Sequence, residues 1–205
     1  MKWAVGVTTV PKRMTDGLLM RTTESLEQAG FDNTILFVDG QQGEMGTCAG
    51  PSRVFRGESV TAYGNFVLAA WELFIRDPSA DRYAMFQDDL VASRNLREYL
   101  EAVPYPPQSY LNLYTWPCNA SAAGNPNWNP HRKGFYLSDQ MGRGAVALVF
   151  DNATMRTLLS APELVHHLDD VNRKTRAIDR AVKNAMGNAH IREFVHNPSL
   201  VQHTG

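Results

Sequence analysis

Short apolar runs alternate with longer amphipathic stretches along most of the chain. The short runs predict buried strands, and apolar positions at helical spacing predict helices that bury one face. The predicted strands cover residues 3–8, 34–38, 83–87, 109–114, 135–137, 145–150 and 191–195. The predicted helices cover residues 15–29, 61–76, 93–103, 152–160 and about 169–186. Strands that alternate with helices predict an α/β fold with a mostly parallel sheet.

Two connecting segments carry no such period. Residues 40–59 are polar and rich in glycine, which predicts an ordered loop. Residues 115–133 are rich in proline, asparagine, tryptophan and glycine. Long loops inside a compact domain are usually functional or disordered. Trp116 and Trp128 in this segment are therefore candidate binding residues, although aromatic side chains also fill cores.

Composition narrows the class of protein. The chain has 205 residues, 43% of them hydrophobic and 20% charged, which suits one ordinary globular domain. The net charge of −1 gives no overall basic field of the kind that attracts nucleic acid or membranes. Cys48 and Cys118 are far apart and form no CxxC pair, so we expect reduced thiols. No signal peptide and no membrane-length apolar stretch is visible, so we expect a cytoplasmic protein, or one in the host cytoplasm if it is viral.

Acidic residues follow two of the predicted strands. Asp88 and Asp89 come directly after the apolar run that starts at Tyr83, and Asp39 follows the strand that ends at Val38. Ligands of open α/β sheets bind outside the carboxyl ends of the strands. Two carboxylates at that edge suit a hard divalent cation that carries a phosphate-bearing substrate. The alternative is that these aspartates only begin turns.

The order of these motifs resembles that of GT-A glycosyltransferases over nearly the whole chain. The residues that carry the resemblance are Val7-Thr8-Thr9-Val10-Pro11-Lys12-Arg13, Asp39, Gly64-Asn65, Gln87-Asp88-Asp89, Gly142-Arg143-Gly144-Ala145 and Pro198-Ser199-Leu200-Val201-Gln202-His203-Thr204-Gly205. The last of these is similar to the ending of the branching N-acetylglucosaminyltransferases of animals. The resemblance implies a Rossmann-like domain that uses a UDP-sugar and Mn²⁺ or Mg²⁺. Residues up to about 90 would bind the donor, and residues from about 91 to 205 would bind the acceptor.

The resemblance also implies roles for single residues. Asp88 would face the ribose and Asp89 would bind the metal, with Gln87 at a position that tolerates change. The remaining nucleotide-binding candidates are Thr8, Thr9, Pro11, Arg13, Asp39 and Asn65. Arg13 can pair with a phosphate, and Asp39 can accept a hydrogen bond from ribose or uracil. The structural alternatives are a solvated arginine, a turn aspartate and, for Asn65, a surface amide.

Two further candidates complete the predicted site. His203 is a candidate metal ligand, because a neutral imidazole binds manganese well and its flanking residues match the family's ending. An inverting transfer needs a base that removes the proton of the acceptor hydroxyl. The resemblance points to an acid at the start of a late helix, and Asp179 is the first choice, ahead of Asp139, Asp169 and Asp170. The alternative for Asp179 is an ion pair with Lys183 one helical turn away.

Three functions remain open from the sequence. The leading one is a metal-dependent, inverting transfer of a sugar from a UDP-sugar to a hydroxyl. A nucleotidyltransferase has a similar sheet, but that class has a glycine-rich phosphate loop where this chain has Thr9-Val10-Pro11-Lys12-Arg13. The third is a carbohydrate-binding protein without activity. The candidate acceptors are a hydroxymethylated DNA base, a small molecule and a glycan.

Overall fold

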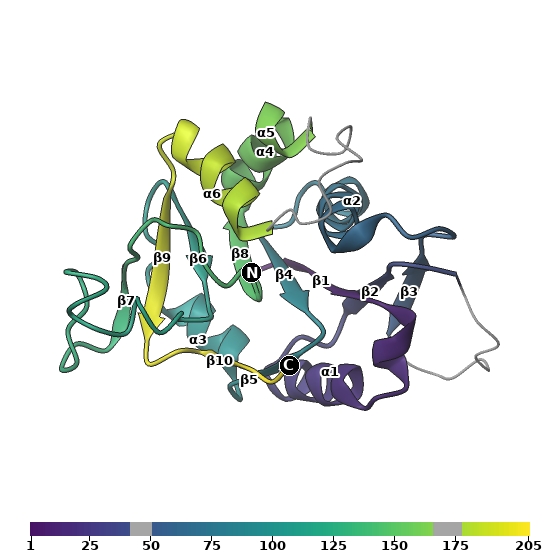
Figure 1. Ribbon diagram of the computed structural model, residues 1–205, viewed down its shortest axis with the longest axis horizontal. Coiled ribbons are helices and arrows are strands. Elements are labelled where there is room, and N and C mark those ends of the chain that lie inside the picture. Colours follow the sequence, from purple (N-terminus) through teal and green to yellow (C-terminus); the bar gives the residue numbers. More distant parts are fainter. Residues whose placement is uncertain (42–50, 166–177) are drawn as a thin grey trace.

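The computed structural model describes residues 1–41, 51–165 and 178–205. Within them, an eight-stranded sheet has the order β3-β2-β1-β4-β8-β6-β9-β7 (Figure 1). Its strands are β1 (Trp3–Thr9), β2 (Thr34–Val38), β3 (Ser52–Phe55), β4 (Arg82–Gln87), β6 (Ser109–Asn112), β7 (Gly134–Leu137), β8 (Ala147–Asp151) and β9 (Arg192–Asn197). A second, two-stranded sheet pairs β5 (Leu90–Ala92) with β10 (Val201–His203) in antiparallel fashion.

Helices cover both faces of the large sheet (Figure 1). They are η1 (Pro11–Met14), a 3₁₀ helix, and α1 (Leu18–Gln28), α2 (Thr61–Arg76), α3 (Leu96–Ala102), α4 (Asn152–Ser160), α5 (Pro162–Val165) and α6 (Ile178–Asn188). Successive residues of β4 alternate between two cores, as the pleat of a strand requires. Tyr83 and Met85 pack with α2, α4 and α6, whereas Ala84 and Phe86 pack with α1 and α3. Because both faces are covered, the strand is apolar throughout.

The direction of β8 determines which loops meet. β1, β2, β3 and β4 are parallel, but β8 is antiparallel to both of its neighbours, β4 and β6. The start of β8 therefore lies at the sheet edge where β4 ends. Gln87 illustrates this, because its backbone N–H donates to Val146 O at 2.9 Å and its side chain donates to Ala145 O at 2.9 Å. β6 and β9 also end at this edge, since they run parallel to β4.

The predicted α/β fold with a mostly parallel sheet is confirmed. Several element boundaries were wrong. Residues 40–59 were predicted to be a loop, but they contain β3, and the strands β5 and β10 were missed. The helix expected from residue 15 begins at Leu18, after the separate 3₁₀ turn η1. The helix expected from residue 169 is described only from Ile178, and Asp169 and Asp170 lie outside the described residues. It ends at Asn188 rather than Met186.

The start of α3 also differs from the prediction, whereas α4 begins at Asn152 as predicted. Ser93, the first residue of the predicted helix 93–103, lies before α3, and its hydroxyl donates to Leu200 O at 2.8 Å and so ties α3 to the chain before β10. The cap of α4 is Asp151, whose carboxylate accepts from Thr154 N at 2.7 Å. No helix within the described ranges is long and apolar enough to cross a membrane.

Thr22 on α1 holds the turn between β4 and β5. Its side chain is buried, and its Oγ lies 2.9 Å from Asp88 O and 2.8 Å from Leu90 O. The same oxygen accepts from Leu90 N at 3.2 Å. One hydroxyl therefore satisfies buried backbone groups on both sides of Asp89. This contact fixes the backbone that carries both strand-end acids.

We predict that Thr22→Val lowers the free energy of unfolding by roughly 1–3 kcal/mol, because it keeps the shape but leaves buried backbone groups unsatisfied. Urea denaturation measures the effect. Thr23→Val is the matched control on the same helix, since among the described residues the Thr23 hydroxyl bonds only to Leu19 O and Met20 O within its own helix. That variant should change stability by about 0.5 kcal/mol or less. Equal losses in the two variants would contradict the role assigned to Thr22.

Candidate functional site

The carboxyl ends of β1 and β4 meet at the point where the strand order reverses. β1 has β2 on one side and β4 on the other, and Thr8 is in register with Gln87. The Thr9 hydroxyl donates to Asp88 Oδ2 at 2.6 Å, so the ends of two adjacent parallel strands are joined by a side-chain hydrogen bond. Such switch points form crevices in α/β sheets. The arrangement brings the candidate residues at the end of β1, Thr8 and Thr9, next to Asp88 at the end of β4.

Asp88 is a buried carboxyl group, with 8% of its surface exposed. Burial raises its pKa above the ordinary value of 3.8, and the neighbouring Asp89 adds to that rise. The Thr9 hydrogen bond and the Arg13 guanidinium act in the opposite direction. Burial of a charged group costs free energy unless polar partners compensate for it. The buried, ionised Asp88 therefore lowers the folding stability of the protein, which indicates that the residue has another role.

Arg13 and His203 surround the adjacent acid. Arg13 Nη2 lies 3.7 Å from Asp89 Oδ2, and Arg13 Nε lies 3.9 Å from Asp88 Oδ1. His203 Nε2 lies 3.2 Å from Asp89 Oδ2. β10 brings His203 here by pairing with β5, and Thr204 N donates to Asp89 O at 2.7 Å. Residues 13, 88, 89 and 203, far apart in sequence, therefore form one cluster.

The donor atoms of this cluster fit a hard divalent cation. Asp89 Oδ1 is buried and has no hydrogen-bond partner among the described residues. The imidazole of His203 adds a nitrogen ligand that suits manganese. Within the described ranges, no three His, Cys, Asp or Glu side chains form a complete metal cage. A cation with one or two protein ligands is common where substrate phosphates complete the coordination.

A cavity of about 210 Å³ lies beside the cluster. It is lined from the ends of β1, β2 and β4 and from the starts of α2 and α6. The lining residues are Thr8, Thr9, Val10, Arg13, Asp39, Ala62, Asn65, Gln87, Asp88 and Ile178. Six of the predicted nucleotide-binding residues are among them. Pro11 is not, but it lies against Gly40, where an added Cβ would come within 3.1 Å of the proline ring.

Asp39 and Asn65 already make strong contacts within the protein. Asp39 accepts from Ser59 Oγ at 2.9 Å and from Val60 N at 2.6 Å, which anchors the start of α2. Asn65 is 1% exposed, so it is not a surface amide. Its Nδ2 donates to Phe37 O at 2.8 Å, and its Oδ1 accepts from Arg56 Nε at 2.8 Å. Both residues line the cavity while they also fix its walls.

Asp179 lies in the first turn of α6 and contacts the glycine-containing loop before β8. Its Oδ2 accepts from Gly144 N at 3.2 Å. Gly142 must lack a side chain, because a Cβ there would lie 2.8 Å from Asp179 O and 2.4 Å from Lys183 Cβ. Among the described residues, Asp179 forms no ion pair with Lys183, so the structural alternative from the sequence is wrong. Ile178, the preceding residue, lines the cavity beside Asp88.

Two other candidates, Asp139 and Arg143, lie in the segment between β7 and β8. Arg143 donates to Cys118 Sγ at 3.1 Å, and its Nε lies 4.0 Å from Asp139 Oδ2. Asp139 also caps a turn by accepting from Met141 N. Gln87 belongs to the predicted motif Gln87-Asp88-Asp89, and the structure places it in the cavity wall. Tyr114 was predicted only as the end of a strand. It lies beside His203, with ring centroids 6.1 Å apart, and no pattern in the sequence signals that position.

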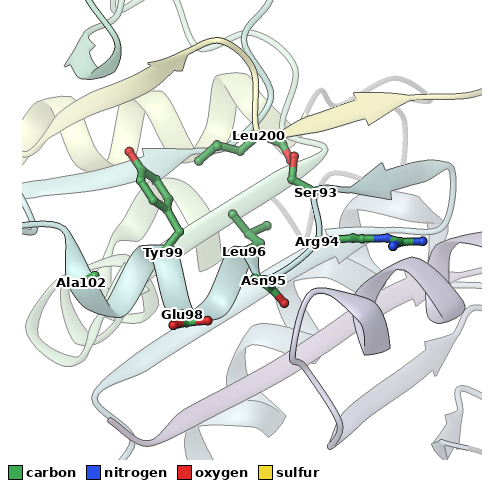
Figure 2. Close-up of a pocket in the computed structure, with 8 residues that line it drawn as sticks. All are labelled: Ser93, Arg94, Asn95, Leu96, Glu98, Tyr99, Ala102 and Leu200. Carbon is green, nitrogen blue, oxygen red and sulfur yellow. The ribbon is translucent and has the colours of Figure 1, made fainter.

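A separate cavity of about 390 Å³ lies next to α3. Figure 2 shows Leu96, Tyr99 and Leu200 among its lining residues, with Arg94 pointing away from them. It contains none of the predicted site residues. Its relation to the site is indirect, because Ser93 and Leu200 flank the β5–β10 pair that carries His203.

Comparison with solved structures supports the description of the fold. A CMP:2-keto-3-deoxy-manno-octonic acid synthetase in complex with CTP aligns over 95% of this chain and 89% of its own, with 14% identity and a TM-score of 0.50. A glycosyltransferase involved in the glycosylation of the major capsid of PBCV-1 aligns over 95% and 82%, with 10% identity and a TM-score of 0.47. No family model and no curated protein matches the chain. At such low identity, the alignment with the synthetase shows a shared fold and nothing finer.

The raised pKa of Asp88 predicts a gain in stability when the charge is removed. The pKa of Asp88 is higher in the folded state than the value of 3.8 for an ordinary aspartate. Above pH 3.8 the folded state therefore holds this proton more tightly than the unfolded state does. Ionisation of Asp88 at higher pH then lowers the stability of the fold. Asp88→Asn should therefore raise the free energy of unfolding at pH 7. The difference between variant and wild type should shrink as pH falls toward 3.8. Urea denaturation at several pH values measures this, and a variant less stable than wild type at pH 7 would contradict it.

Proposed function

We propose that this protein is a metal-dependent glycosyltransferase that moves a sugar from a UDP-sugar to an acceptor hydroxyl with inversion at the anomeric carbon. The observation that carries the proposal is the cluster of Arg13, Asp88, Asp89 and His203 beside the strand-end cavity. Its chemistry suits a diphosphate and a cation. The likeness of the fold to a nucleotide-using synthetase is consistent with a transferase.

The donor would lie across the switch point of the sheet. Thr8, Thr9, Asp39 and Asn65 would surround the nucleoside, and Asp88 would accept a hydrogen bond from the ribose. Asp89 and His203 would hold Mn²⁺ or Mg²⁺, which when bound neutralises the charge of the leaving diphosphate. Pro11 would shape the loop after β1. Arg13, which now lies near both acids, can turn its guanidinium to a phosphate, where a charge-assisted hydrogen bond is strong.

Asp179 would serve as the base. The acceptor oxygen forms a bond to the anomeric carbon while the bond from that carbon to the diphosphate oxygen breaks. The electron pair of the broken bond leaves with the diphosphate, and the acceptor proton moves to the Asp179 carboxylate. The hydrogen bond from Gly144 N holds one carboxylate oxygen in place, which orients the group for this transfer. This assignment accounts for a carboxylate beside the cavity that forms no ion pair with Lys183.

Nucleotidyl transfer is the second candidate, because the synthetase shares the fold. The loop after β1 argues against it. Its backbone forms the 3₁₀ helix η1 with Pro11 at the start, and proline lacks the N–H that a phosphate-binding loop would use. The two functions differ in their products. A glycosyltransferase releases UDP from a UDP-sugar, whereas a nucleotidyltransferase releases pyrophosphate from a nucleoside triphosphate.

We expect UDP and Mn²⁺ to strengthen each other's binding, because the diphosphate supplies ligands that the protein lacks. Isothermal titration calorimetry of UDP with Mn²⁺ and with EDTA measures the coupling. Asp89→Ala should remove it, while Asp32→Ala, an exposed acid before the opposite end of β2, should not. Equal UDP affinity with manganese and with EDTA would contradict the metal site.

We expect His203→Ala to weaken metal-dependent turnover by about 10–100-fold, the usual cost of lost support at a metal site. Asp89→Ala should abolish turnover, because it removes the only carboxylate assigned to the metal. Circular dichroism checks that both variants remain folded. Wild-type turnover in Asp89→Ala would rule out this residue as the metal ligand.

We expect Asp179→Asn to lower turnover by about 10²–10⁴-fold with little change in UDP affinity, because asparagine keeps the shape and the Gly144 contact but cannot take a proton. Asp32→Asn, at an exposed acid outside the site, is the control and should keep full turnover. An Asp179→Asn variant with full activity would overturn the assignment of the base. Nuclear magnetic resonance of the product gives an independent result, since a retained anomeric configuration would remove the need for this base.

A further inference from the structure

Two aromatic rings form a series of contacts from His203 to the loop that holds the candidate base. The Tyr114 ring is 6.1 Å from the His203 ring, and the Trp116 ring is 6.1 Å from the Tyr114 ring at an interplanar angle of 87°. A Cβ on Gly144 would lie 2.7 Å from Tyr114 Cδ1 and 3.3 Å from Trp116 Cε3. The N–H of the same glycine donates to Asp179. Both rings therefore pack against the loop that holds the candidate base.

Trp116 is exposed although its backbone is firmly held. Its exposed fraction is 38%. The preceding residue, Thr115, is buried, and its hydroxyl donates to His196 O at 2.6 Å. Its backbone N–H donates to Ser199 Oγ at 3.0 Å, so both polar groups of Thr115 fix the backbone before Trp116. An exposed indole on a fixed backbone contributes little to the core. It does offer a rigid apolar surface to a ligand, at low cost in conformational entropy.

The polar groups around this surface suit hydroxyl groups better than phosphates. Asp179, in the first turn of α6, accepts from the N–H of Gly144, the glycine against which both rings pack. Asp139 lies on the same loop as Arg143, whose Nε is 4.0 Å from the Asp139 carboxylate. A phosphate would meet both carboxylates, while Arg143 is partly neutralised by one of them. The net charge of −1 provides no overall field to attract a polyanion. A neutral sugar ring is not repelled by these carboxylates and needs no free cation to balance its charge.

We propose that Trp116 forms the floor of an acceptor subsite that takes a neutral pyranose ring. The apolar C–H face of the sugar stacks on the indole, and one of its hydroxyl groups points to Asp179. Tyr114 supports the indole and separates it from His203. The inference rests on the proposed glycosyl transfer and names the class of its acceptor, a glycoside rather than a nucleic acid.

The test compares Trp116→Ala with Trp71→Ala. Trp71 on α2 has the same exposed fraction of 38% and lines a different surface cavity. With UDP-sugar and Mn²⁺, both transfer to a panel of methyl pyranosides and hydrolysis of the donor by water are measured. Trp116→Ala should lower the ratio of transfer to hydrolysis by about 10-fold through a higher KM for the pyranoside. Trp71→Ala should leave the ratio unchanged.

Three results would overturn the proposal. Equal losses of transfer and hydrolysis in Trp116→Ala would indicate a purely structural role. An unchanged ratio would mean that the indole does not contact the acceptor. Transfer to hydroxymethylated oligonucleotides but to no pyranoside would identify a nucleic-acid acceptor instead.

A binding measurement separates this inference from the proposed function. If the wild-type protein neither transfers sugar nor hydrolyses any UDP-sugar, the proposed function fails. Tryptophan fluorescence titrated with the methyl pyranosides then tests the subsite alone. A shift of emission in the wild type that disappears in Trp116→Phe supports the subsite, and no shift, or the same shift in both proteins, overturns it.

Discussion

The hydrogen bond from Thr9 to Asp88 joins the ends of two parallel strands around a buried carboxyl group. Burial raises the pKa of Asp88, so the protein gives up stability to keep an acid at this edge. Thr22 holds the following turn from α1, and Arg13 approaches from the loop after β1. The positions of Asp89 and His203 follow from that turn, because β5 starts directly after it and pairs with β10. Strain of this kind in a sheet crevice is typical of functional sites.

The sequence predicted the parts of this edge that depend on local pattern. Apolar runs that end in acids indicated β2 and β4, and helical spacing gave the bounds of α2 correctly. The short strands β3, β5 and β10 have no clear alternation, and their pairing depends on distant residues, so they could not be read. The reversed direction of β8 is equally invisible in a single sequence. Without it, Gly144 and Asp179 would not lie near the end of β4. His203 and Asp179 entered the predicted site through the family resemblance, and periodicity alone would not have selected them.

The sheet does not distinguish between the candidate reactions, because proteins with the same fold can catalyse different reactions. The alignment with the synthetase at 14% identity likewise shows the fold alone. Local features favour sugar transfer. A proline begins the turn after β1, and an imidazole lies 3.2 Å from Asp89. At the start of α6, the Asp179 carboxylate accepts from Gly144 N and forms no ion pair with Lys183 in the part of the chain that the structure describes. Each of these features depends on the loops at one sheet edge rather than on the core.

The central claim is that Asp89 and His203 hold a divalent cation at this edge together with a diphosphate. Anomalous X-ray scattering from crystals grown with Mn²⁺ and UDP tests it most directly. The account predicts a manganese peak within bonding distance of an Asp89 carboxylate oxygen and His203 Nε2, with oxygens of the diphosphate completing the coordination. A fully bound UDP with no manganese peak at these two residues, or with manganese held elsewhere on the chain, would contradict it.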